Sequence, residues 1–259
     1  MTRLVCVSDT HLSHEQGSSV LPAFTVPPGD VFVHAGDMTW SGTLDEIVRA
    51  MKWILRLPHP HKVIIAGNHD RLFERNNALA RSLVPESIVY LEDQPVEVMG
   101  LSFYGSPWTP RFLNWAFNLD RGGPLREKWA MIPHKLDVLV THGPPYGVLD
   151  EVPVEPKHGL WEPGSRLKEH VGCGELRKVV MDKARPKLHL FGHIHCSRGV
   201  HKTGHTVFVN AAIVDDMCEP RAHAVVVDFS PEPDDSFAAS YPMCPYVWIK
   251  KLDSEGPPV

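Results

Sequence analysis

Four consecutive residues, Gly67-Asn68-His69-Asp70, place an amide, an imidazole and a carboxylate side by side. They follow residues 63–66, an apolar run typical of a buried strand, and we expect them to form the turn where that strand ends. An amide oxygen can bind a hard metal ion, an imidazole can move a proton, and a carboxylate can hold that imidazole in one orientation. The tetrapeptide indicates a site only if other parts of the chain bring partners to it.

Metal-capable side chains also follow four other predicted strands. The runs at residues 4–8, 31–35, 137–141 and 187–191 are typical of buried strands. The polar residues at their ends are Asp9, His11, Asp37, His142, His193 and His195. In open α/β sheets, ligands bind beyond the carboxyl ends of the strands, so these distant turns can meet. Any one motif is more often an ordinary turn, but five in this order, each after a strand, predict a metal site.

The spacing of these residues fits a shared site. Asp9 and His11 are two residues apart, as are His193 and His195, so both side chains of a pair point the same way from an extended strand end. Glycine lets the backbone turn sharply beside a crowded site. Three of the turns contain one: Gly36, Gly67 and Gly192.

The donor types indicate the kind of metal. Imidazoles, carboxylates and one amide oxygen suit Mn, Fe or Zn better than Ca or Mg, and the motifs lack the thiolates of a structural zinc site. The donors are too many for one ion, whereas two ions bridged by a carboxylate fit their number.

With these motifs, the sequence resembles the calcineurin-like metallophosphoesterase superfamily. The pattern of that superfamily is D-x-H, G-D, G-N-H-[DE], H and G-H-x-H, and every block is present between residues 4 and 229. The sequence is more similar still to the fetal-brain metallophosphoesterase-domain proteins, often grouped with class III cyclic nucleotide phosphodiesterases. That likeness lies at residues 6–11, 104–110, 115–118, 140–145 and 190–195.

The resemblance implies a fold and a ligand assignment. The fold would be α/β, with four layers in the order α/β/β/α, mixed sheets and the metal site at the carboxyl ends of the strands. The ions would be two, with Mn²⁺ preferred and Fe or Zn as alternatives. The first metal would be held by Asp9, His11 and His195, the second by Asn68, His142 and His193, and both by Asp37.

The expected reaction is in-line hydrolysis of a phosphate ester, without a covalent enzyme intermediate. Two ions can share a water and lower its pKa, which gives a metal-bridged hydroxide as nucleophile without a protein base. His69 would bind no metal, and as imidazolium it would protonate the leaving group. Asp70 is expected to orient His69, although a plain salt link or a helix cap before Leu72 would look the same in sequence.

The remaining pattern supplies the elements that position the turns. A helix is predicted over residues 44–55, with a Thr43/Glu46 capping box at its start and Pro58 after its end. Its predicted apolar face is Leu44, Ile47, Val48, Met51, Ile54 and Leu55. Other helices are predicted at residues 76–83, 125–131 and 175–184, and other strands at 88–91, 96–98, 101–105, 206–210 and 222–229.

Two parts of the chain lack this regularity. Residues 143–172 are rich in Pro and Gly, and loops of such length are usually functional or disordered. Residues 230–259 read as a C-terminal tail that packs on the main body through residues 246–249. We therefore expect a metallophosphoesterase domain at residues 1–229 followed by this tail.

Composition narrows the class of partner. The chain has 259 residues and a formal net charge of -5, without a Lys/Arg run, so long nucleic acids are not expected as ligands. Its 5 cysteines form no C-x-x-C pair, which favours reduced thiols. No apolar run approaches the ~20 residues of a membrane helix. A strand that starts near Leu4 leaves no room for a signal peptide, so we expect a cytoplasmic protein without membrane contact.

Aromatic residues after the strand at 101–105 are candidates for substrate contact. A nucleobase can stack on such side chains, although packing in the core or in a lid explains them equally well. These candidates are Trp108, Phe112, Trp115 and Phe117. We expect a small phosphate-ester substrate, with cyclic nucleotides and hence a phosphodiesterase as the leading hypothesis.

Other functions on the same scaffold remain open. A phosphomonoesterase or phosphoprotein phosphatase would need the same ligands, and a nuclease is disfavoured by the missing basic surface. A non-catalytic scaffold would need neither a complete ligand set nor a proton donor such as His69. The physiological substrate, the metal and the oligomeric state do not follow from the sequence.

Overall fold

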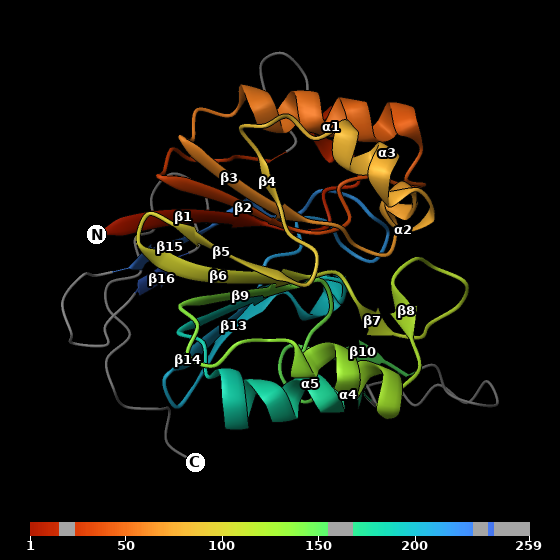
Figure 1. The fold of residues 1–259 in the computed structure, drawn as a ribbon, viewed down its shortest axis with the longest axis vertical. Coiled ribbons are helices and arrows are strands. Elements are labelled where there is room, and N and C mark those ends of the chain that lie inside the picture. The colour runs from red at the N-terminus through yellow and green to blue at the C-terminus, as the bar shows by residue number, and fades with distance from the viewer. Residues whose placement is uncertain (16–23, 155–167, 230–237, 241–259) are drawn as a thin grey trace, which may run out of the picture.

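The structure, a computed structural model, describes residues 1–15, 24–154, 168–229 and 238–240. Two sheets lie face to face, and helices cover their outer faces, which gives the expected α/β/β/α order (Figure 1). The strand order is β16-β15-β1-β2-β3-β4 in the first sheet and β13-β14-β12-β9-β6-β5 in the second.

The first sheet comprises β1 (Thr2–Val7), β2 (Val31–Ala35), β3 (His61–Ile65), β4 (Val89–Tyr90), β15 (Val225–Phe229) and β16 (Ala238–Ser240). The second comprises β5 (Gln94–Val98), β6 (Leu101–Ser106), β9 (Val138–Thr141), β12 (Leu188–Phe191), β13 (Gly199–Thr203) and β14 (Thr206–Asn210). Strands β1 to β4 run parallel to one another, and so do β6, β9, β12 and β14. The carboxyl ends of the central strands therefore share one edge in each sheet.

Helices α1 (Leu44–Arg56), α2 (Arg71–Arg75) and α3 (Asn77–Ser82) lie on the outer face of the first sheet (Figure 1). On the second sheet lie α4 (Gly123–Ala130) and α5 (Gly174–Val179), which the π-helical turn η2 (Val180–Ala184) continues. The Thr43/Glu46 capping box of α1 is formed as predicted.

The buried face of α1 is narrower than predicted. It consists of Ile47, Ala50, Met51 and Ile54. Leu44 and Leu55, which we had placed on that face, are each 48% exposed. Both lie at the edge of the stripe, where the helix surface turns away from the sheet.

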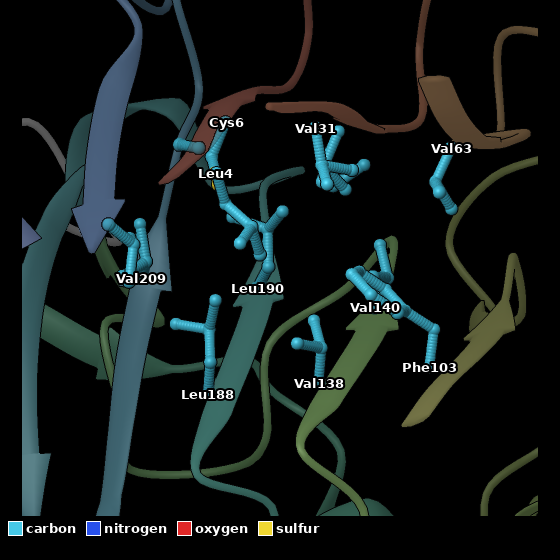
Figure 2. Close-up of a cluster of buried hydrophobic side chains, with 14 of the residues drawn as sticks. Leu4, Cys6, Val31, Val63, Phe103, Val138, Val140, Leu188, Leu190 and Val209 are labelled. Carbon is cyan, nitrogen blue, oxygen red and sulfur yellow. The ribbon is translucent and has the colours of Figure 1, made fainter. Parts of the chain in front are cut away.

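Three apolar clusters separate the four layers. The central one fills the space between the sheets, where Leu4 and Cys6 of the first sheet face Leu188 and Leu190 of the second (Figure 2). The alternate residues of β1, such as Val5, point to the other side and belong to the cluster that includes α1. Strands buried on both faces explain why the sequence shows continuous apolar runs rather than alternation.

Several short elements were not predicted. They are η1 (Ser13–Glu15), α2, β7 (Thr109–Pro110), β8 (Asn118–Leu119), β10 (Glu151–Pro153), β11 (Lys168–His170), η3 (His195–Ser197), β13 and β16. All of them span two to five residues, and none contains an apolar run long enough to indicate a strand or a helix. Strand β16 pairs with β15, so the first sheet continues past residue 229, while residues 246–249 lie outside the described part. Among the described residues, no helix has the length and apolar character needed to cross a membrane.

Candidate metal centre

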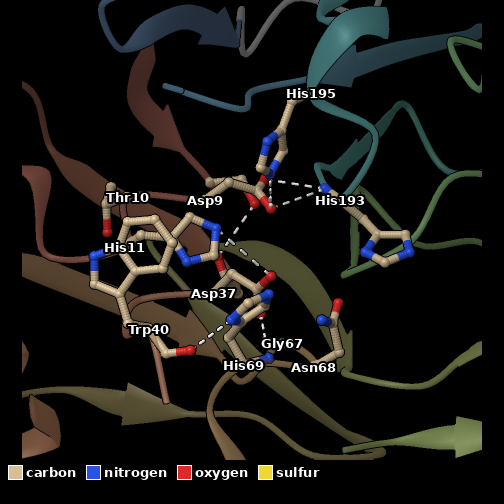
Figure 3. Close-up of polar contacts among 12 residues, drawn as sticks. Asp9, Thr10, His11, Asp37, Trp40, Gly67, Asn68, His69, His193 and His195 are labelled. Carbon is tan, nitrogen blue, oxygen red and sulfur yellow. Dashed lines mark hydrogen bonds and ion pairs between the residues drawn. The ribbon is translucent and has the colours of Figure 1, made fainter. Parts of the chain in front are cut away.

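The five predicted turns meet at the carboxyl edge of the two sheets. Figure 3 shows the turns that carry Asp9, Asp37, Asn68 and His193. Within the described ranges, three groups of side chains place one potential ligand atom each within 4.8 Å of the others. They are Asp9–His11–His195, His11–Asp37–His69 and Asp37–His142–His193. The first group consists of residues that the resemblance assigns to the first metal, and the third group of residues assigned to the second. The second group connects them, because it shares His11 with the first and Asp37 with the third.

Asn68 lies at the group that contains His142. Its Oδ1 is 2.8 Å from Nε2 of His142, and that nitrogen is 3.3 Å from Oδ2 of Asp37. At the other group, Nε2 of His195 is 3.3 Å from Oδ1 of Asp9. The structure thus brings all seven expected ligands to one place.

Backbone carbonyls orient three of the imidazoles. Nδ1 of His11, His142 and His195 each lies at hydrogen-bond distance from a main-chain oxygen, and donation there leaves Nε2 to face the centre. The acceptors are Thr39 at 2.9 Å, Ala35 at 3.0 Å and Asp215 at 2.9 Å. Nε2 of His11 is buried and has no hydrogen-bond partner among the described residues. A bound cation would supply the partner that this buried nitrogen lacks.

Four of the expected ligands have a left-handed backbone. The φ angles are 53° at Asp9, 41° at His11, 55° at Asp37 and 67° at His193. Residues other than glycine adopt this conformation at a cost of about 1–3 kcal/mol each, and such residues concentrate at functional sites. The surrounding hydrogen bonds must therefore hold these ligands in place.

Two of the predicted glycines are required by crowding. A Cβ on Gly67 would collide with the Asp37 carboxylate and lie 2.7 Å from Cε1 of His142. A Cβ on Gly192 would collide with the side chains of Asp9 and Ser8. The ligands pack against bare backbone at both positions.

The charges of the centre are strongly coupled. Burial alone would raise the pKa of Asp9, but the hydrogen bond and charge of His195 hold it below its usual range. Burial likewise opposes a charge on His195, yet Asp9 raises the pKa of that imidazole to about 11. Burial also opposes a charge on His142, while Asp37 raises its pKa to about 9. Two buried carboxylates thus draw positive charge onto their neighbours.

The donor set therefore fits a pair of cations. It offers buried carboxylates that attract positive charge, imidazole nitrogens that face inward and one amide oxygen. Metal ions would replace the protons that His142 and His195, with their raised pKa values, otherwise carry.

Residues 2–197 match the family model described as calcineurin-like phosphoesterase, which covers most of the chain. The chain belongs to this family. Metallophosphoesterase domain-containing protein 1 of Homo sapiens is 38% identical to it over 257 residues, spanning 91% of this chain and 73% of that protein. UPF0046 protein C25E10.12 of Caenorhabditis elegans is 34% identical over 241 residues, spanning 87% and 80%.

A solved structure agrees with the fold. The crystal structure of TT1561 of Thermus thermophilus has a TM-score of 0.53 and 12% identity, and the match covers 93% of this chain and 98% of that one. Family membership makes the protein a metal-dependent phosphoester hydrolase by class.

His69 of this phosphoesterase is held beside the ligands. Its backbone N–H donates to Oδ1 of Asp37 at 2.7 Å, and its Nδ1 lies 2.6 Å from the carbonyl oxygen of Trp40 (Figure 3). Donation from Nδ1 leaves Nε2 as the nitrogen available to a substrate. The ring also lies tilted against that of Trp115, with the two centroids 4.0 Å apart and 34° between the ring planes.

Asp70 does not contact the His69 ring, so the direct orienting role that we predicted is wrong. It precedes α2 but makes no side-chain cap hydrogen bond either. Instead, its buried carboxylate accepts from the backbone N–H groups of Met38 at 3.2 Å, Thr39 at 3.0 Å and Gly67 at 2.8 Å, and from the Thr39 hydroxyl at 2.7 Å. Burial and the nearby Asp37 raise the pKa of Asp70 to about 6.

Asp70 acts on two imidazoles through residues 38–40. The Thr39 carbonyl that Asp70 helps to fix accepts from His11, and the next carbonyl, of Trp40, accepts from His69. Sequence reasoning missed this 38–40 segment because it contributes backbone atoms, which leave no mark in the residue types.

The aromatic residues that we predicted to contact the substrate do not lie together in one place. The Trp108 indole N–H donates to Asp93 at 2.9 Å, and the ammonium group of Lys128 lies 4.5 Å from its ring centroid. Phe117 is only 1% exposed and belongs to the core, while Phe112 is 63% exposed. Of the predicted aromatic residues, Trp115 has a ring contact with a site residue.

Trp40 is an aromatic neighbour that sequence reasoning did not include. Its side chain is 40% exposed, and its ring centroid lies 5.0 Å from that of His11. It follows the G-D motif by only three positions, which is the signal that could have identified it.

Proposed function

We propose that the protein is a dinuclear metal-dependent phosphodiesterase that acts on small phosphate esters, with cyclic nucleotides as the leading candidates. The observation that supports it most is the pair of ligand groups joined through His11 and Asp37, with the His69 imidazole beside them. A scaffold protein would have no use for an imidazole held at this point by a carbonyl and an indole.

The ligand assignment is part of this proposal. One metal would be held by Asp9, His11 and His195, the other by Asn68, His142 and His193, and both by Asp37. Such ions supply Lewis acidity for the phosphoryl oxygens and lower the pKa of an attacking water. Mn²⁺ is our proposed ion, because the mixture of imidazole, carboxylate and amide donors suits it.

The role of His69 follows from its hydrogen bonds. Nδ1 is engaged by the Trp40 carbonyl, so Nε2 is the atom that can give a proton to the leaving oxygen. Asp37 accepts the backbone N–H of His69, which ties the proton donor to the residue proposed to bridge the metals. The proton donor and the ligands are therefore positioned by one set of contacts.

A small substrate and a cytoplasmic location are also part of the proposal. The net charge of -5 and the absence of a Lys/Arg run support a small substrate rather than a long nucleic acid. The odd number of cysteines, without a C-x-x-C pair, supports a cytoplasmic setting.

The direct test compares a phosphodiester with its monoester. With Mn²⁺, we expect hydrolysis of bis-p-nitrophenyl phosphate to exceed that of p-nitrophenyl phosphate in kcat/KM. Asp37→Asn should abolish turnover, whereas Asp120→Asn, at an exposed surface carboxylate, should not. A preference for the monoester would favour the phosphatase alternative, and bound metal without turnover of either ester would favour the scaffold.

Substrate class needs a second comparison. Rates on 2′,3′- and 3′,5′-cyclic nucleotides with Mn²⁺, Zn²⁺, Fe²⁺ and Mg²⁺ would identify both the substrate and the preferred ion. Hydrolysis of the synthetic diester without any cyclic nucleotide turnover would retain the phosphodiesterase and reject the nucleotide.

A further inference from the structure

One hydrogen bond holds the His69 ring and another holds its backbone. Its backbone N–H is held by Asp37 and its Nδ1 by the Trp40 carbonyl. The side chain is only partly buried, so these bonds alone leave the ring free to tilt about the Nδ1 contact. A proton donor that tilts loses its alignment with the leaving oxygen, and small misplacements are costly in catalysis.

Trp115 supplies the missing contact on the face of the ring. The His69 and Trp115 centroids are 4.0 Å apart with an angle of 34° between the ring planes. On another side, the ring of His11 meets His69 edge-on, at 4.7 Å and 80°. The imidazole is therefore confined by an indole and by the ring of a proposed metal ligand.

Trp115 is itself held in place. The guanidinium carbon of Arg71 lies 4.6 Å from the centre of the indole ring, and the backbone N–H of Arg71 donates to the His69 carbonyl at 2.8 Å. The next residue, Ala116, donates its N–H to the carbonyl of Asn68 at 3.2 Å. The backbone beside the indole is thus tied to the residue that precedes His69.

These contacts argue against Trp115 as a platform for a nucleobase. Its ring already carries an imidazole and a guanidinium at stacking distance. A base that stacked at either of these places would have to displace the group there, and losing His69 from the indole would work against the reaction.

We propose that Trp115, backed by Arg71, is a positioning residue that keeps His69 in the orientation from which Nε2 protonates the leaving group. The inference rests on the proposed function, in which His69 is the proton donor. It assigns to Trp115 a role in kcat rather than in substrate affinity.

The test uses two diesters of similar shape that differ in their need for a proton. p-Nitrophenolate leaves easily without protonation, while phenolate from diphenyl phosphate is a poorer leaving group and depends more on a general acid. For Trp115→Ala, we expect kcat on diphenyl phosphate to fall about tenfold further than kcat on bis-p-nitrophenyl phosphate, since general acid catalysis supplies 10²–10⁴-fold. The KM values should change by no more than about twofold.

Matched variants separate positioning from folding. Trp115→Phe keeps an aromatic face and should restore most of the diphenyl phosphate activity. Leu113→Ala, in the same loop with a 67% exposed side chain, should leave both activities as they are. If Trp115→Ala does not fold, Trp115→Leu, which keeps apolar bulk without a ring face, takes its place.

The outcomes distinguish the two proposals. No hydrolysis of either diester by the unaltered protein would overturn the proposed function itself. An active protein in which Trp115→Ala lowers both rates equally, or raises KM with little change in kcat, would overturn the positioning role and return Trp115 to substrate binding.

Discussion

The first sheet and the second sheet contribute different chemistry to the same centre. The strand ends of β1, β2 and β3 supply both carboxylates, the amide and the proposed proton donor: Asp9, His11, Asp37, Asn68 and His69. The ends of β9 and β12 supply imidazoles alone, from His142, His193 and His195. In the proposed assignment, the first sheet thus carries the carboxylates and the proton donor, and the second sheet completes the coordination.

The support behind the ligands is nevertheless alike in the two sheets. On the first, buried His34 lies with Nε2 2.9 Å from the hydroxyl of Thr10, between Asp9 and His11. On the second, buried His189 lies with Nε2 2.8 Å from the hydroxyl of Thr141, next to His142. The sheets therefore differ in the groups they present rather than in how they are braced.

Removal of His69 should have the largest effect on activity and tests the role proposed for the first sheet. His69→Ala is expected to retain both metals and to lose about 10²–10⁴-fold in kcat on diphenyl phosphate, because it removes only the proton donor. Metal content by atomic emission and kcat with Mn²⁺ are the two measurements. Loss of metal from this variant would refute the role we give His69.

His193→Ala should lose activity because it binds metal less tightly, and not because it lacks a proton donor. We expect its metal affinity to fall by at least about 10–100-fold, with activity recovering as Mn²⁺ is raised. A titration of activity against Mn²⁺ concentration measures this directly, with His69→Ala as the control that added metal cannot rescue. If neither variant, or both, responded to metal, the division of labour between the sheets would be wrong.

Asp70→Asn tests the 38–40 segment. The asparagine amide would point an N–H group at N–H and O–H groups that now donate to the carboxylate. Because these hydrogen bonds would be lost, we expect the unfolding free energy to fall by about 1–3 kcal/mol. Activity should fall about 10–100-fold, as for other groups that orient ligands. Urea unfolding and kcat are measured together, and Asp70→Glu, which keeps the charge, should recover part of both. Full activity in Asp70→Asn would leave the 38–40 segment without a role in catalysis.

The last prediction concerns the buried histidines behind the ligands and affects stability alone. Burial lowers the pKa of His189 from 6.5 to about 3, so below pH 6.5 the unfolded chain takes up a proton that the folded protein does not. Stability is therefore lost as pH falls. When the pH is lowered from 7 to 5, the unaltered protein should therefore lose about 2 kcal/mol more unfolding free energy than His189→Gln does.

His34 is the matched residue for this measurement. Burial lowers the pKa of His34 to about 3 as well. Urea unfolding at pH 7 and pH 5 should therefore show for His34→Gln the same gain in stability over the unaltered protein as for His189→Gln. Unequal gains would show that the two sheets are not braced alike, and no gain in either variant would show that both histidines are protonated inside the fold.

Local patterns explain which elements could be predicted. The strands at 31–35 and 206–210 have the predicted bounds, and the α1 capping box forms as expected, because each depends on a few neighbouring residues. Helix α2 was missed because its five residues make little more than one turn. Strand β13 was missed because Gly199–Thr203 contains no apolar run like those of the two predicted strands. Long-range pairing also places β4 on the first sheet and β5 on the second, which no short pattern reveals.

The candidate site divides in the same way. Side chains such as Asp37 and His142 could be named because their type and their place after a strand are visible. The carbonyls of Thr39 and Trp40 could not, since any residue carries a carbonyl. Asp70 was assigned to the nearest imidazole, whereas its carboxylate reaches back across the turn to residues 38 and 39.

The left-handed backbone at Asp9, His11, Asp37 and His193 has a consequence for engineering. Glycine adopts this conformation more readily than any of these side chains. A library selected only for thermal resistance would therefore be drawn toward glycine at the very positions proposed to bind metal. Selection for heat tolerance in this protein must include a turnover screen, or the most robust survivors will be inert.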